Sequence, residues 1–485
     1  MRRLLPLATF AAVLGFGTVR AADPPTATEK VSYYRDVRPI FMQNCQGCHQ
    51  PAKANGGYVM TDLASLQKAG EAKKPGIVPG KPEASYLVRE ITLVKGKAEM
   101  PKGRDPLSAV QVKLIAEWIR QGATDDTPAS AKTSAIDAAH PPVYRASPVV
   151  TSLAYSPNGQ FLAVAGYHEI LLHKADGSAV VARLVGLSER IQSLAFSPDG
   201  KFLAASAGDP GRVGEIQIWD VEKQKLKSST PLTFDTLYGV SWSPDGTTIA
   251  VGCSDNTVRA IDTASGDQVL QMGTHSDWAL GTAFSQDGQH LVSVSRDMSV
   301  KLTEVTTQRF VDNVTSITPG ALKGGLMAID RRPTKEKKMA AVPADTPNAP
   351  ARVYDEILIG GADGAPRLYK MHREKKREIG DDSNKITQYE AMPGRITSLA
   401  FAADGVRFAV TSSLDGKGEV RIYATATAAK KIVCEKITGP AYSVSWAPNG
   451  KQIASAGFDG LVWIHDAATG KLVKQFAAVP LTPAK

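Results

Sequence analysis

Two cysteines and a histidine stand together near the start of the chain, in the run Cys45-Gln46-Gly47-Cys48-His49. Two thiols three positions apart, followed at once by an imidazole, form the attachment motif of a c-type haem. The spacing has a chemical reason, because the thiols form thioether bonds to the vinyl groups of one haem edge while the histidine lies beneath the iron. The motif predicts one covalently bound haem c, attached through Cys45 and Cys48, with His49 as the proximal iron ligand.

Two other uses of paired cysteines compete with haem attachment. A thioredoxin-like redox pair has the same spacing, but it requires a βαβ context, and the neighbouring sequence is typical of helix and loop. A zinc site requires a second pair of ligands, and Cys253 and Cys434 are distant and isolated. These two cysteines lie in apolar runs typical of strands, which favours small buried side chains. Haem attachment is therefore the favoured hypothesis.

Two predicted helices frame this part of the chain. Residues 33–43 carry apolar side chains at helical spacing, which predicts a short helix leading into the cysteine motif. A second helix begins after Ser108, in a capping-box pattern with Gln111, and ends at Gly122. Together they predict one small helical domain over residues 31–126.

Further motifs follow in order between the two helices. They are Gly-Gly-Tyr-Val-Met-Thr-Asp-Leu at 56–63, Val-Pro-Gly-Lys-Pro-Glu-Ala-Ser-Tyr-Leu at 78–87, Met-Pro at 100–101 and Trp-Ile at 118–119. This order resembles the planctomycete-type cytochrome c domain over about a fifth of the chain. The resemblance implies a small all-α fold like that of class I cytochromes c, in which the terminal helices cross.

The resemblance also implies a second axial ligand. A Met-Pro step shortly before the last helix resembles the sixth-ligand loop of that fold, so Met100 is the predicted distal iron ligand. A thioether opposite an imidazole raises the reduction potential and suits electron transfer. Alternatives stay open, because Met100 could be a core side chain, and Met60 or His140 could bind the iron instead. If none binds, the iron is five-coordinate.

The N-terminus has the layout of a secretory signal peptide. Arg2 and Arg3 precede an apolar run from Leu4 to Val19, and small residues follow at Ala21 and Ala22. We expect a cleaved signal over residues 1–21, a linker over 22–30, and a periplasmic or otherwise exported protein without a transmembrane segment in the mature chain. Export agrees with the resemblance, since bacteria attach c-type haem outside the cytoplasmic membrane.

Composition and charge narrow the function only slightly. The chain has 485 residues, of which 43% are hydrophobic, as in an ordinary globular protein of two or three domains. Loss of the three arginines of the signal lowers the formal charge from +9 to +6. Nucleic acid binding therefore has little support, and a weak preference for anionic partners is the most that follows.

After a linker over residues 127–146, rich in Ala, Pro, Ser and Thr, the sequence becomes repetitive. An apolar strand followed by Ser-Pro-Asp-Gly, or a close variant, recurs about every 41 to 46 residues outside an expanded fifth copy. In this tight turn the proline presets one dihedral angle and the glycine adopts a left-handed one. The copies begin at Val150, Ile191, Tyr238, Leu280, Ile396 and Tyr442, with a degenerate one near Gly325.

The period, with Trp219-Asp220 on a third strand, resembles WD40 repeats and implies an all-β propeller over residues 147–485. Seven copies predict seven blades, although the Trp-Asp pair is not repeated in every copy. We expect Leu472 to Ala477 to supply the outer strand of the first blade and so to close the ring. An eight-bladed ring of the quinoprotein type would need different tryptophan-bearing repeats.

Basic residues flank the expanded fifth repeat at 331–338 and 373–377. Mixed-charge runs are usually solvated loops. The alternative is a docking site for an acidic redox partner, because charge steers the encounter between electron carriers. Arg190 and Arg395 precede equivalent strands and could face one mouth of the ring, where they could bind an anion.

The propeller region carries no recognisable catalytic triad, phosphate-binding loop or metal-ligand cluster in its sequence, although sites assembled from several blades are hard to see in sequence. An electron carrier or binding protein is therefore predicted rather than an enzyme. The first hypothesis is an exported electron carrier whose propeller docks a redox partner protein. The alternatives are a redox enzyme with a substrate site in the propeller and a haem that relays electrons, and a haem-based redox-sensing scaffold.

Overall fold

The computed structural model describes residues 30–128, 136–318, 322–334, 338–339, 353–376, 378, 380–428 and 431–482. The predicted signal peptide lies outside these residues, as do parts of the predicted linker at 127–146 and of the two basic runs. No helix within the described ranges is long and apolar enough to cross a membrane.

A small N-terminal domain carries the cysteine motif and has few helices. Its helical segments are η1 (Tyr33–Val37), α1 (Arg38–Asn44), η2 (Asn55–Gly57), α2 (Leu63–Gln67), η3 (Pro82–Ala84), α3 (Tyr86–Ile91) and α4 (Ala109–Arg120). A two-residue antiparallel ladder joins β1 (His49–Gln50) to β2 (Lys53–Ala54). The framing helices were predicted correctly, but the all-α class expected for this domain is not confirmed.

The first and last helical segments meet in the core of this domain. Pro39 lies in the first turn of α1, where its missing N–H breaks no helical hydrogen bond. Ser108 and Gln111 form the predicted capping box at the start of α4, with the Gln111 amide donating to Ser108 Oγ at 3.3 Å. Trp118 of α4 stacks on Tyr33 of η1 with ring centroids 5.2 Å apart, which joins the two ends of the domain.

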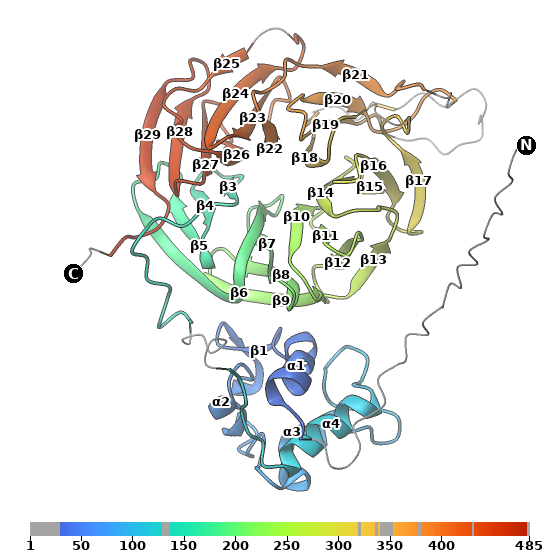
Figure 1. Ribbon diagram of the computed structural model, residues 1–485, viewed down its shortest axis with the longest axis vertical. Coiled ribbons are helices and arrows are strands. Elements are labelled where there is room, and N and C mark those ends of the chain that lie inside the picture. The colour runs from blue at the N-terminus through green and yellow to red at the C-terminus, as the bar shows by residue number, and fades with distance from the viewer. Residues whose placement is uncertain are drawn as a thin grey trace, which may run out of the picture.

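The rest of the described chain forms antiparallel sheets around a central channel (Figure 1). The first sheet contains seven strands in sequence order. They are β3 (Leu153–Tyr155), β4 (Phe161–Ala165), β5 (Tyr167–Lys174), β6 (Val180–Phe196), β7 (Phe202–Asp209), β8 (Val213–Asp220) and β9 (Lys225–Thr233). The long strand β6 pairs mainly through its first half with β5 and through its second half with β7, so this sheet comprises two four-stranded units.

Five further sheets each have four strands in sequence order. They comprise β10 (Leu237–Trp242), β11 (Thr248–Cys253), β12 (Val258–Asp262) and β13 (Gln268–Met272); β14 (Ala279–Phe284), β15 (His290–Ser295), β16 (Val300–Glu304) and β17 (Arg309–Asn313); β18 (Leu326–Arg331), β19 (Glu356–Gly361), β20 (Arg367–Lys370) and β21 (Lys385–Gln388); β22 (Arg395–Phe401), β23 (Arg407–Leu414), β24 (Lys417–Ala424) and β25 (Lys431–Val433); and β26 (Ala441–Trp446), β27 (Gln452–Gly457), β28 (Leu461–Asp466) and β29 (Leu472–Ala477). The arrangement fits the predicted seven blades, and the degenerate repeat supplies β18.

The ring closes differently from the prediction. The segment Leu472–Ala477 is β29, which pairs with β28 of the last sheet and not with the first blade. The reason is that the first half of β6 already occupies the outer position beside β5. Closure instead joins β3 to β26, where the Leu153 and Tyr155 amides donate to Ser443 and Ser445 hydroxyls at 3.0 Å.

Candidate haem site

The cysteine motif forms the turn between α1 and β1. A main-chain hydrogen bond from the His49 amide to the Cys45 carbonyl, 3.0 Å long, holds the turn. The Cys45 side chain packs against the buried core of the domain, whereas Cys48 is exposed. All four cysteines are free, and Cys253 and Cys434 are buried in different parts of the propeller. The two thiols predicted for haem attachment are thus unbridged and lie on one turn.

The imidazole of His49 is oriented by a main-chain carbonyl. His49 Nδ1 lies 3.1 Å from the carbonyl oxygen of Tyr58. Because a carbonyl only accepts, Nδ1 carries the proton in this contact and Nε2 keeps the lone pair that an iron ligand needs. Burial also lowers the pKa of His49, which favours the neutral ring. The donor chemistry of His49 therefore fits axial ligation of a haem iron.

The environment of Cys45 fits a thioether better than a thiolate. Burial raises the pKa of the Cys45 thiol to about 12, so the anion is disfavoured there. Thiol–disulfide exchange proceeds through the thiolate. A thioether sulfur carries no charge and can occupy the same apolar surroundings. This favours haem attachment over a thioredoxin-like redox pair.

Met100 lies in the segment between α3 and α4. Its amide donates to the Glu90 carbonyl at 3.0 Å, which ties the residue to α3. Its side chain is partly buried against the same apolar core that Cys45 contacts. The structure thus brings Met100 and the motif to one core, and its role as distal ligand stays a prediction.

Met60 and His140, the two alternatives to Met100 as iron ligand, make other contacts. Met60 is only 2% exposed, and its amide donates to the His49 carbonyl at 2.8 Å. Met60 is thus a core residue whose main chain is hydrogen-bonded to that of His49. His140 lies in an exposed segment, with Nδ1 3.1 Å from Asp137 Oδ1.

Two residues that shape the site were not singled out from the sequence. Gln46 is buried, and its side-chain amide donates to the Met60 carbonyl at 2.9 Å. The Tyr58 hydroxyl donates to the Leu66 carbonyl at 2.7 Å, which holds the segment whose carbonyl orients His49. Tyr58 belongs to the Gly-Gly-Tyr motif, so a signal for it was present, whereas Gln46 occupies a position that the motif leaves unspecified.

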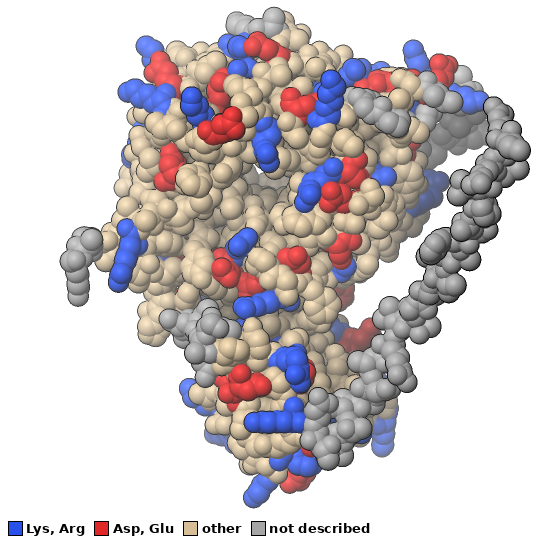
Figure 2. All heavy atoms as spheres, in the orientation of Figure 1, with Lys and Arg blue, Asp and Glu red and all other residues tan. Residues whose placement is uncertain are grey.

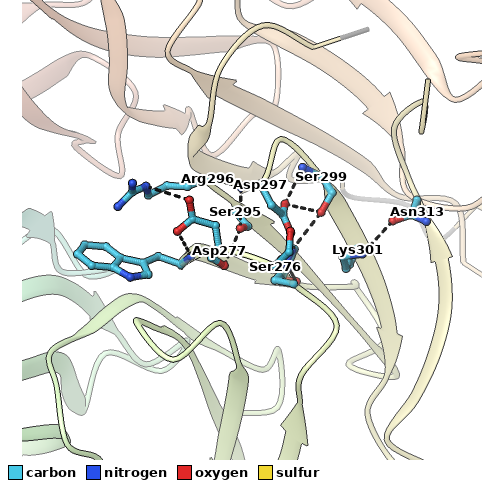
Figure 3. Close-up of polar contacts among 11 residues, drawn as sticks. Ser276, Asp277, Ser295, Arg296, Asp297, Ser299, Lys301 and Asn313 are labelled. Carbon is cyan, nitrogen blue, oxygen red and sulfur yellow. Dashed lines mark hydrogen bonds and ion pairs between the residues drawn. The ribbon is translucent and has the colours of Figure 1, made fainter. Parts of the chain in front are cut away.

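The propeller encloses a cavity of about 1350 Å³ along its central channel. Arg395 lines it as expected, whereas Arg190 is not among the lining residues. Arg296, at the cavity wall, lies 3.5 Å from a carboxylate oxygen of Asp277 and 4.7 Å from the ring centre of Trp278 (Figure 3). The charges lining the cavity are therefore of both signs, which gives little support to an anion site.

The buried His275 lies in the connection between β13 and β14 and contacts β15 and the turn that follows it. His275 Nδ1 lies 3.0 Å from Asp297 Oδ2, and Nε2 lies 2.8 Å from Ser293 Oγ. Burial favours the protonated acid of Asp297, but hydrogen bonds from His275, Ser299 and the Ser276 amide outweigh it and hold its pKa well below the usual range (Figure 3). The contacts of this buried network are structural.

In the described parts of the two basic runs, most arginines form ion pairs with acidic residues of the propeller. Arg332 contacts Glu356 at 2.6 Å, and Arg373 contacts Asp312 and Asp381 at 3.2 and 2.9 Å. On the face shown in Figure 2, basic and acidic side chains are interspersed over both domains. These pairs weaken the hypothesis that the runs dock an acidic partner.

Comparison with family models finds relatives for both parts of the chain. A model described as planctomycete cytochrome C matches residues 45–103. The model of the WD domain, G-beta repeat, matches residues 139–181, 178–220, 266–303 and 433–466. A model of the anaphase-promoting complex subunit 4 WD40 domain matches residues 235–281.

Curated relatives share short stretches with the chain. It is 40% identical over 65 residues to WD repeat-containing protein 62 of Mus musculus, 28% over 84 residues to the WD repeat-containing protein 91 homolog of Dictyostelium discoideum, and 34% over 91 residues to WD repeat and SOCS box-containing protein 1 of Danio rerio. These stretches cover 13%, 17% and 18% of this chain and 4%, 11% and 22% of the relatives. The chain thus spans less than a quarter of the length of these relatives.

Proposed function

The chain joins a planctomycete-type cytochrome c domain to a set of WD40 repeats, and we propose that it is an exported electron carrier with one covalent haem c. The observation that carries the proposal is the cysteine motif, in which His49 has its Nδ1 occupied by the Tyr58 carbonyl. That contact leaves Nε2 as the ligand atom. Export is proposed from the layout of the N-terminus and from the chemistry of haem attachment.

Each residue of the site has a role in this proposal. A bound haem supplies one-electron oxidation and reduction of its iron. Cys45 and Cys48 anchor it through thioethers, and Tyr58 holds the His49 ring in one tautomer and orientation. Met100 would be the second ligand of the iron and would thereby close the site to small molecules. The apolar core that Cys45 and Met100 contact excludes water from this region.

WD40 repeats generally mediate protein–protein interaction, and we assign the propeller the docking of the redox partner. The haem domain lies outside the ring (Figure 1), so the channel mouths are not covered by it. Tyr238 and Trp278 stack at the cavity wall with ring centroids 5.8 Å apart, and Trp278 is 36% exposed. Exposed aromatic residues of this kind are favoured at protein interfaces.

The test is a spectrum of the purified full-length protein. We expect a covalent haem that survives denaturation and is reduced by mild reductants, in the wild type and in the control Cys253→Ala. The double variant Cys45→Ala/Cys48→Ala should carry none. A wild-type protein without covalent haem, or with a haem that cannot be reduced, would contradict the proposal.

Fractionation of cells tests the proposed location. We expect the wild-type chain, shortened by the signal, in the periplasmic fraction. A chain of unchanged mass in the cytoplasmic fraction would contradict export.

A further inference from the structure

The haem-attachment turn lies against the outside of the propeller. In Figure 1 the N-terminal domain lies beside β9, with α1 and β1 toward the ring. β9 is the last strand of its sheet, so one of its edges has no neighbouring strand within that sheet. An open strand edge presents unpaired N–H and C=O groups, which proteins usually cover or protect.

Two main-chain carbonyls on this edge contact the haem domain. Lys53 Nζ donates to the Lys227 carbonyl at 2.6 Å. A Cβ atom built on Gly47 would lie 2.4 Å from the Ser229 carbonyl oxygen and 3.3 Å from Pro231 Cδ. Lys227 and Ser229 are two residues apart on β9, and the carbonyls of both face the haem domain. The glycine between the two cysteines thus allows a main-chain approach that a side chain would prevent.

Neighbouring contacts extend the interface on both sides. Ala52 packs against the apolar cluster of the first two blades. An Arg212 guanidinium nitrogen lies 3.4 Å from the Tyr34 hydroxyl oxygen. Apolar packing and polar contacts therefore both join the domains at this edge.

The edge is supported from inside the blade. The Ser229 hydroxyl donates to Glu215, which is 4% exposed. Glu215 also accepts hydrogen bonds from Ser188 Oγ and Gln217 Nε2, each 2.6 Å long. A buried carboxylate with several donors fixes the position of β9. The carbonyls that meet the haem domain are thus held in place before docking.

We propose that the edge of β9 is a built-in docking site for the haem-attachment turn and determines which side of the haem domain a redox partner can reach. The docking contacts themselves do not involve haem, and only the consequence for the partner rests on the proposed function. The propeller covers Gly47 of the docked turn, whereas Cys48 stays exposed. The segment after α3, where Leu93 and Val94 are 49% and 65% exposed, is left open to a partner.

The test compares two substitutions that add the same methyl group to the full-length protein. Gly47→Ala places it against the Ser229 carbonyl, whereas Gly273→Ala places it where nothing lies within 4 Å. We expect Gly47→Ala to retain covalent haem, because this position supplies no bond to it. Its radius of gyration in small-angle scattering should increase, and cleavage between the domains should be about tenfold faster or more. The control should behave as wild type.

A second variant avoids the motif altogether. Lys53→Met/Arg212→Met removes two polar contacts across the interface, and we expect several-fold faster cleavage between the domains. Wild-type scattering and cleavage in Gly47→Ala would overturn the docking proposal, as would wild-type cleavage in the double variant. Absence of haem from the wild type would contradict the proposed function, while the scattering comparison would still decide the docking.

Discussion

The propeller builds its core from sheets that repeat one local pattern, whereas the haem domain surrounds a single motif with short helices and long loops. In the propeller, most strands pair with the next one in sequence, so hydrogen-bond partners are close along the chain. In the haem domain the core joins the first helix to the last, and Cys45 and Met100 pack at its margin. The propeller core therefore rests largely on local strand pairing, whereas the proposed function implies that a bound haem completes the core of the haem domain.

The largest expected effect is a loss of stability that is confined to the haem domain when haem attachment is removed. In Cys45→Ala/Cys48→Ala the haem domain should lose about 4 kcal/mol or more of unfolding free energy, because a tightly bound group stabilises only the folded state. The propeller transition should not move. Calorimetry of the full-length protein measures both transitions. A common shift of the two transitions would show that the domains do not differ in this way.

The second prediction distinguishes the proposed iron ligand, Met100, from the core residue Met60. Met60→Ala should cost about 3 kcal/mol, because Met60 is almost fully buried. It should leave the reduction potential unchanged. Met100→Ala should lower the potential and give small ligands access to the iron, with a smaller loss of stability. Potentiometry and thermal unfolding of both variants check this, and an unchanged spectrum in Met100→Ala would refute the axial assignment.

Sequence could predict those parts of the molecule that depend on local chemistry. The Ser-Pro-Asp-Gly turns predicted the inner strands because each turn requires particular backbone angles. Gly200, for example, has a φ of +72°. Ser108 and Gln111 likewise predicted the start of α4. For the candidate site, the motif pointed to Cys45, Cys48 and His49 because covalent haem attachment restricts their spacing, and their roles stay predictions.

Closure and docking could not be predicted, because they depend on contacts between groups far apart in sequence, and one partner in most of these contacts is a main-chain group. Nothing in the residues of β6 shows that this strand continues for 17 residues and serves two blades. Gly47 approaches the Ser229 carbonyl through main-chain atoms, and neither side chain takes part in this contact. Sequence patterns describe side chains, so such contacts leave no local signal.

The third prediction tests a buried contact of the propeller. Asp297→Asn should cost about 2 kcal/mol at pH 7, because it removes a charged acceptor from the His275 network. Since the folded-state pKa of Asp297 lies below its unfolded value of 3.8, the contribution is complete above that pH and declines as the pH falls below it. The difference between variant and wild type in denaturant unfolding should therefore shrink at pH 3.

Asp267→Asn is the matched control, because Asp267 is exposed at a strand connection. It should change the unfolding free energy by less than about 0.5 kcal/mol at either pH. If the two substitutions were equally costly, the blade would not depend on this network.

The smallest expected effect is the loss of stability that follows removal of the N-cap of α4 in the haem domain. Ser108→Ala removes the hydroxyl that accepts from the Gln111 amide, and an N-cap loss of this kind costs about 1 kcal/mol. Ser108→Asp should retain most of the stability, because a carboxylate also accepts from the first turn and interacts favourably with the helix dipole. Calorimetry should show the loss in the haem-domain transition alone. If Ser108→Ala lowered the propeller transition by the same amount, the two domains would unfold as one cooperative unit, and the docking of the attachment turn on β9 would be the contact that couples them.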